Sequence, residues 1–222
     1  MVKERIIETN HGISGEFNVE MYDKFMRRRR DRGGWIDTDS ILEAGINLGV
    51  ALEIGPGPCY LGLEWLKKTE NTYLQTLEIS LDMINIAEKN AIEYNLQNRV
   101  KNNLGNALEM PFEDNMFDGV FSNGSLHEWS QPIKVFNEIY RVLKLGGKYC
   151  ISDLRRDINP LVKWYMKRTV KPIEMREGLI ASINASYTIK ELHRLLPNTN
   201  LRNYKIKKIF MGLMVQGVKT GK

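Results

Sequence analysis

Two glutamates and two glycines stand at spacings that suit the binding of a nucleotide-type ligand. Glu53, Gly55 and Gly57 follow a short apolar run, and Glu78 ends the next apolar run along the chain. Glycines let the backbone approach a ligand closely, and the free N–H groups of a following helix face it. A carboxylate offers two acceptor oxygens, which suit the two hydroxyls of a ribose. The spacing therefore predicts a nucleotide-cofactor cradle.

The cradle needs a buried strand, a tight turn and a helix to position it. Residues 50–54 have the apolar character of a buried parallel strand, and residues 60–68 are expected to form the helix. A dinucleotide-binding turn would carry a third glycine where this chain has Tyr60. The turn therefore does not match the dinucleotide-binding motif.

Strand and helix patterns alternate through residue 152, which predicts a mostly parallel sheet with helices on both faces. We expect Asp39 or Ser40 to cap a helix at 41–45, and Gly146 with Gly147 to stop a helix at 133–143. Thr188 and Glu191 form a capping box for a helix that Pro197 stops. The remaining expected elements are a helix at 81–95, strands at 73–78, 100–104, 117–122 and 148–152, and an antiparallel pair at 202–210 and 211–218.

The run Glu53-x-Gly55-x-Gly57-x-Cys59 resembles the first motif of the class I S-adenosylmethionine-dependent methyltransferases, in particular the type-11 group of small-molecule enzymes. Cys59 stands where that family usually has its third glycine. The resemblance covers about residues 45–218. It implies a doubly wound, Rossmann-like α/β fold with seven strands in the order 3-2-1-4-5-7-6, strand seven being antiparallel.

The same resemblance implies a set of cofactor contacts and a leading segment, residues 1–34, that covers the cofactor pocket as a helical lid. Residues 35–222 would form the S-adenosylmethionine-binding domain. Because residues 155–187 contain helical stretches and no strand between them, we expect them to form a helical cap inserted over the sheet. Glu78 would accept the ribose hydroxyls, and Asn106 replaces the aspartate that usually receives the adenine amine. The full set of expected cofactor-binding residues is Glu53, Gly55, Gly57, Glu78, Ile79, Met83, Asn106, Ala107, Asn123 and Gly124.

Two residues are candidates for the chemistry of methyl transfer. An in-line displacement on a sulfonium methyl needs alignment above all, and a base only when the acceptor atom carries a proton. His127 follows the fourth strand, where the acceptor should arrive, and is the candidate base. Tyr22 lies on a helix with Phe17, Phe25 and Met26, and in the resembling family an aromatic of the leading segment lies near the methyl group. Either residue could instead have a purely structural role.

Two alternatives to a small-molecule methyltransferase remain open. The net charge is +5, and a cluster at Arg27, Arg28, Arg29, Arg30 and Arg32 could serve as the footprint of an RNA methyltransferase, or simply be a solvated face. A protein that binds S-adenosylmethionine without turnover is a further alternative. Calorimetric binding without methylated product would distinguish it, and salt-sensitive RNA binding would support the RNA reading.

The loop after the fourth strand, Ser122-Asn123-Gly124-Ser125, lacks the Pro-Pro-aromatic run of enzymes that methylate exocyclic amines or glutamine. Two cysteines, Cys59 and Cys150, have no metal-ligand spacing and form no disulfide framework, so we expect both to be buried hydrophobes. The sequence shows no signal core or membrane-spanning run. A cytoplasmic enzyme that methylates a small molecule, uses S-adenosyl-L-methionine and releases S-adenosyl-L-homocysteine is the expectation. The acceptor and the oligomeric state stay open.

Overall fold

A seven-stranded sheet forms the centre of the computed structural model, which describes residues 4–6, 15–32 and 37–221. The strand order is β3-β2-β1-β4-β5-β7-β6, and β7 runs antiparallel to both of its neighbours, as the resemblance predicted. The strands are β1 (Val50–Ile54), β2 (Tyr73–Glu78), β3 (Val100–Leu104), β4 (Phe117–Asn123), β5 (Leu143–Leu154), β6 (Asn203–Lys208) and β7 (Gly212–Val218).

Helices cover both faces of this sheet because its central strands are apolar on both sides. Leu52 and Ile54 of β1 pack into one core with helix α5, while Ala51, the residue before Leu52, packs into the other core with α3 and α4. The alternation follows the two-residue period of a strand. The helices are α1 (Glu16–Asp31), α2 (Asp37–Glu43), α3 (Tyr60–Lys67), α4 (Leu81–Glu93), α5 (Pro132–Val142), α6 (Pro160–Thr169), α7 (Met175–Ala185) and α8 (Ile189–Leu195), with short 3₁₀ turns η1 (Gln97–Arg99), η2 (Leu126–Glu128) and η3 (Leu196–Asn198).

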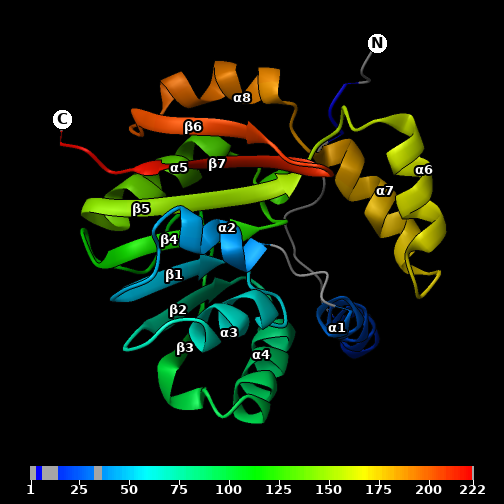
Figure 1. Cartoon of the computed structure of the whole chain (residues 1–222), viewed down its shortest axis with the longest axis horizontal. Coiled ribbons are helices and arrows are strands. Elements are labelled where there is room, and N and C mark those ends of the chain that lie inside the picture. Colours follow the sequence, from blue (N-terminus) through cyan, green and yellow to red (C-terminus); the bar gives the residue numbers. More distant parts are fainter. Residues whose placement is uncertain (1–3, 7–14, 33–36, 222) are drawn as a thin grey trace.

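Helices α1, α6 and α7 lie at the edge of the sheet toward which the arrowhead of β5 points (Figure 1). The segment 155–187 is helical and has no strand, as expected. Cys59 and Cys150 are buried free thiols, which confirms the expectation for both. Among the described helices, none is long and apolar enough to cross a membrane.

Two local predictions are wrong, both at helix ends. Helix α2 begins at Asp37, so Asp39 and Ser40 lie inside it and cap nothing. Thr38 and Ile41 are both buried. Their spacing of three residues keeps them on one helix face. Because that face is buried from Thr38 onward, the helix begins about one turn earlier than capping by Asp39 or Ser40 would place it.

Gly146 and Gly147 lie inside β5 and do not stop α5, which ends at Val142. Leu143 is already extended and pairs with Phe117, after which the β4–β5 register shifts. Gly146 has a φ of +79°, and a Cβ at Gly147 would lie only 2.8 Å from the carbonyl oxygen of Lys144. The two glycines therefore permit an irregularity within a strand, where backbone segments approach closely.

Candidate functional site

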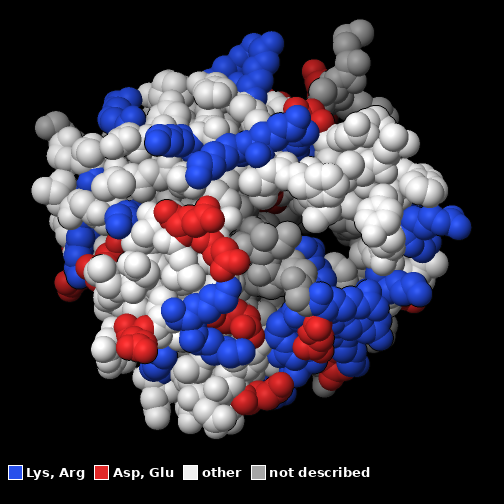
Figure 2. Space-filling view, in the orientation of Figure 1, with Lys and Arg blue, Asp and Glu red and all other residues white. Residues whose placement is uncertain are grey.

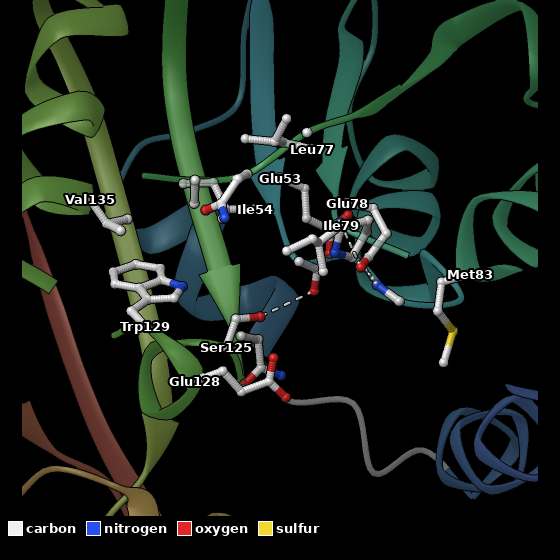
Figure 3. A pocket seen from close by; sticks show the side chains of 18 of the residues that line it. Glu53, Ile54, Leu77, Glu78, Ile79, Met83, Ser125, Glu128, Trp129 and Val135 are labelled. Atoms are coloured by element: carbon white, nitrogen blue, oxygen red, sulfur yellow. Dashed lines mark hydrogen bonds between the residues drawn. The ribbon is translucent and has the colours of Figure 1, made fainter. Parts of the chain in front are cut away.

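A pocket opens at the carboxyl ends of β1, β2 and β4, with α1 at its rim (Figure 3). Open α/β sheets bind their ligands at this edge. Of the twelve residues expected at the site, the structure brings eleven to the pocket wall; His127 lies behind the wall. The remaining lining residues are Met26, Ile54, Pro56, Leu61, Leu77, Gly105, Leu108, Ser125, Glu128, Trp129, Ser130 and Val135.

Glu78 at the end of β2 is held in place by three backbone donors. Its Oε1 accepts the N–H groups of Ile79 at 2.9 Å and Ser80 at 3.0 Å, and its Oε2 accepts the N–H of Gly57 at 3.1 Å. Burial raises the pKa of this carboxyl, whereas the three N–H donors lower it. The carboxylate therefore joins the end of β2 to the glycine-rich loop and faces the pocket in a fixed orientation.

Glu53 at the end of β1 is buried and turned toward the start of α3. Its Oε2 lies 3.7 Å from Sγ of Cys59, and the N–H of Gly62 also donates to the carboxyl. Burial raises the pKa of Glu53 to about 8, so the group carries a proton over much of the neutral range. These contacts tie the end of β1 to the start of α3.

The glycine turn has the shape of a cradle that side chains would fill. Gly55 has a φ of +63°, and a Cβ there would lie 2.2 Å from Oγ of Ser125. Gly57 has a φ of +52°, and a Cβ there would lie 3.4 Å from the Tyr22 ring. Left-handed backbone and close neighbours both require glycine at these positions. The residues present therefore fit a cofactor that contacts the backbone of the loop.

The expected contacts beyond β2 and β3 also reach the pocket. Ile79 and Met83 line it from the start of α4, and Asn106 with Ala107 line it after β3. Asn106 Oδ1 accepts the N–H of Leu108 at 2.9 Å, which closes the loop on itself. An amide oxygen has two lone pairs, so one remains for a ligand donor.

The β4 side of the pocket is formed by Asn123, Gly124 and Ser125. The N–H of Gly124 donates to the carbonyl of Ser152 at 2.9 Å, and Oγ of Ser152 lies 3.3 Å from Oδ1 of Asn123. Ser125 donates from Oγ to the carbonyl of Gly55 at 3.3 Å (Figure 3). These bonds tie the ends of β1, β4 and β5 together and fix the spacing of the pocket walls.

Tyr22 reaches the pocket from α1, together with Met26 one turn later. Burial raises the pKa of Tyr22 to about 12, and the carboxylate of Glu128 contributes to the same shift. The phenol is therefore neutral at physiological pH and available as a hydrogen-bond donor. Helix α1 thus contributes Tyr22 and Met26 to the wall of the site. Of the expected lid at 1–34, residues 1–3, 7–14 and 33–34 lie outside the described residues.

His127 is buried behind the pocket wall, on η2. Its Nδ1 lies 3.0 Å from both oxygens of Asp153, and its backbone N–H donates to Asp153 Oδ2 at 2.6 Å. Its Nε2 lies 3.9 Å from Oε1 of Glu128, and Glu128 does line the pocket. The histidine therefore does not line the pocket itself and lies one residue behind the wall, beside Glu128.

The arginine cluster of α1 is partly engaged within the chain. Arg27 Nη1 donates to both oxygens of Glu93, at 2.6 and 2.9 Å, and Arg30 donates to the hydroxyl of Tyr94 at 3.1 Å. Both guanidinium groups also lie over the ring of Tyr60. Arg28 and Arg29 are exposed. Figure 2 shows basic side chains gathered over the region of α1, at the lower right.

Asp153 is the residue that the sequence reasoning missed. It stands at the carboxyl end of β5, the same position that singled out Glu53 on β1 and Glu78 on β2. An acidic residue at the carboxyl end of the fifth strand is therefore the sequence signal by which Asp153 could have been predicted. Its pairing with His127, 26 residues away, has no local signature.

Comparisons with known proteins agree with this geometry. A model of the family described as Methyltransferase domain matches residues 52–151. The demethylmenaquinone methyltransferase of Lactobacillus johnsonii is 28% identical over 141 residues, covering 63% of this chain and 52% of the relative. The ubiquinone/menaquinone biosynthesis C-methyltransferase of Rickettsia prowazekii is 30% identical over 120 residues, covering 52% of this chain and 48% of the relative. The chain spans about half the length of these curated relatives.

A solved structure matches over nearly its whole length. It is a protein from Methanococcus maripaludis whose own assignment as an S-adenosyl-L-methionine-dependent methyltransferase is provisional. It is 26% identical with a TM-score of 0.76, and the match covers 95% of this chain and 99% of that one. Residues 52–151 therefore match the methyltransferase-domain family, and the seven-stranded fold that contains them is similar to that of the Methanococcus maripaludis protein.

Proposed function

We propose that this protein is an enzyme that transfers a methyl group from S-adenosyl-L-methionine to a small-molecule acceptor. The observation that carries the proposal is the Glu78 carboxylate, fixed by three backbone donors beside the Gly55–Gly57 turn and facing the pocket. In this position its oxygens would accept the ribose hydroxyls, and the amide oxygen of Asn106 would accept the adenine amine. When bound, the sulfonium of the cofactor supplies a methyl carbon already activated for displacement.

The chain's own contribution is alignment and the exclusion of water. Ile79 and Met83 would pack on the adenine, while Asn123 and Gly124 would hold the methionine part against the end of β4. Tyr22 and Met26 would close the site from α1, with Tyr22 beside the transferred methyl. Alignment of this kind can lower a barrier by roughly 7–11 kcal/mol.

An acceptor atom that loses a proton needs a base, and His127 is proposed for that task. A proton on Nδ1, donated to Asp153, leaves the lone pair of the ring on Nε2, the atom nearer Glu128 and the pocket. Because Glu128 lines the pocket and His127 does not, the acceptor's proton would pass first to the Glu128 carboxylate and from there to Nε2 of His127. A carboxylate on the pocket side would also favour an acceptor with a donor group at its reacting end.

Calorimetric titration with S-adenosyl-L-methionine and S-adenosyl-L-homocysteine tests the cofactor part. Micromolar binding of both is expected, and Glu78→Ala should weaken it at least tenfold. Glu70→Ala, an exposed glutamate before β2, is the matched control and should bind as the natural chain does. Unchanged affinity in Glu78→Ala would contradict the ribose role, and no binding of either compound would overturn the whole proposal.

Transfer of a labelled methyl group to candidate acceptors tests the enzymatic part. Product formation is the expected result. Cofactor binding without product across a broad acceptor set would instead favour a protein that binds the cofactor without turnover. Retention on RNA at low salt, lost as salt is raised, would favour the RNA alternative, because phosphate contacts release counterions.

A further inference from the structure

Helix α6 presents an apolar face that the rest of the described chain leaves exposed. Leu161, Trp164 and Tyr165 are 76%, 61% and 59% exposed, and Ile173 just beyond the helix is 58% exposed. Residues 161, 164 and 165 follow the three- and four-residue spacing of one helix face. Single exposed apolar residues need no explanation, but four of them within 13 residues, two of them aromatic, mark an interaction surface.

The outward direction of this face is fixed by packing on its other side. Lys163 donates to Oδ1 of Asn184 on α7 at 3.1 Å, and Val170, which ends the helix, is buried. The Asn159 side chain caps the helix by accepting the N–H of Leu161 at 2.8 Å. Helix α6 is therefore already docked on α7 and capped, so the exposed face is not the one that holds it to the fold.

Basic residues accompany this apolar face. Residues 160–173 contain no acidic residue, and besides Lys163, which bonds to α7, they contain Lys167, Arg168 and Lys171. The guanidinium of Arg168 lies 5.7 Å from the centre of the Trp164 ring, so a cation sits at the edge of the apolar surface. Figure 2 shows the same arrangement, with a largely uncharged surface over α6 and α7 at the right and blue side chains at its margin.

We propose that the α6 face docks on the surface of a membrane that contains anionic lipids. Tryptophan and tyrosine prefer the headgroup level, where one end of the ring is apolar and the other wet. Lysine and arginine beside them are attracted to anionic headgroups. Aromatic residues on one face with basic residues at its border are the pattern of a helix that lies in the interface plane.

The length of α6 suits a helix that lies on a lipid surface. A helix of ten residues spans about 15 Å, half the thickness of a bilayer core, so it can lie in the interface but not cross it. The proposal stands apart from the proposed function, because docking requires neither cofactor nor acceptor.

Flotation of the full chain with lipid vesicles tests the proposal. The natural chain should bind vesicles of phosphatidylglycerol mixed with phosphatidylcholine, and less well as salt is raised. Trp164→Ser combined with Tyr165→Ser should weaken binding at least tenfold. Lys167→Gln combined with Arg168→Gln should remove most of the preference for phosphatidylglycerol over phosphatidylcholine alone.

Leu145→Ser is the matched control, because Leu145 is 70% exposed near the opposite end of β5 and should not affect binding. All of these positions are on the surface, so the variants should unfold at the same temperature as the natural chain. The proposal is overturned if the natural chain floats with neither vesicle, or if the Trp164/Tyr165 variant floats equally well. It is also overturned if the natural chain forms a dimer in the absence of lipid that Trp164→Ser abolishes, since a second copy then covers this face.

Discussion

The Asp153 carboxylate holds His127 at two points, 3.0 Å from Nδ1 of the ring and 2.6 Å from the backbone nitrogen of the same residue. It also accepts the N–H of Leu154 at 2.6 Å, so it is fixed from its own strand as well. Both side chains are buried. The ring is therefore oriented by β5 although it belongs to the segment after β4.

Asp153→Asn should lower kcat at least tenfold while cofactor affinity stays within twofold. An asparagine amide turned toward Nδ1 favours the proton on Nε2, so the atom nearer the pocket no longer accepts one. His127→Ala should give a similar loss of kcat. In the natural chain kcat should rise with pH as His127 loses its proton, and this rise should be absent from His127→Ala. Steady-state rates against pH, with calorimetry of the cofactor, provide the measurement. Full turnover in His127→Ala would remove His127 from catalysis.

Glu53 should make the stability of the protein depend on pH. Its pKa in the fold is about 8 against an ordinary value of 4.5, so the fold keeps a proton that the unfolded chain releases. This contribution to stability is fully present below pH 4.5 and is lost as pH rises to about 8, by up to about 1.4 kcal/mol per pH unit. Glu53→Gln should make the free energy of unfolding decline less steeply with pH. Denaturant unfolding from pH 5 to 8 measures this free energy, and Glu70→Gln, at an exposed position, is the control. Equal slopes of the free energy against pH in the natural chain, Glu53→Gln and Glu70→Gln would contradict the prediction.

Cys59 occupies a left-handed position, with a φ of +64°, at the start of α3. A side chain there costs about 1–2 kcal/mol relative to glycine, which the family usually has at this point. Cys59→Gly should therefore be more stable than Cys59→Ala by about 1 kcal/mol, the reverse of the usual order for these two residues. Chemical denaturation of the pair is the measurement. If Cys59→Ala were the more stable, the left-handed backbone would not be the reason for the family's glycine.

Arg27 should fix helix α1 against the rest of the domain. Its guanidinium bonds to Glu93 and Asn90 on α4 and lies over Tyr60 on α3. Arg27→Ala should speed amide hydrogen exchange in α1 severalfold and weaken cofactor binding, because Tyr22 and Met26 reach the pocket from the same helix. Arg28→Ala, an exposed neighbour, is the control. Equal exchange in both variants would mean that apolar packing alone holds α1.

The sequence, through its family resemblance, predicted the order of the strands, and it predicted eleven of the 23 residues that line the pocket. Apolar runs such as residues 50–54 and 73–77 reveal buried strands locally. Because parallel strands end at one edge, Glu53, Glu78 and Asn106 could be placed together without any knowledge of long-range contacts. The capping box of Thr188 and Glu191 was equally local and is confirmed.

Only the tertiary structure decided the features that depend on distant segments. The pairing of His127 with Asp153, and of Arg27 with Glu93 across 66 residues, joins positions with no shared sequence signal. The place of Gly146 and Gly147 depends on β4, whose pairing extends β5 back to Leu143 in spite of the usual preference of glycine for helix ends. The outward face of α6 depends on how that helix docks on α7. Local pattern fixes which element forms, whereas packing fixes which side chains meet and which remain exposed.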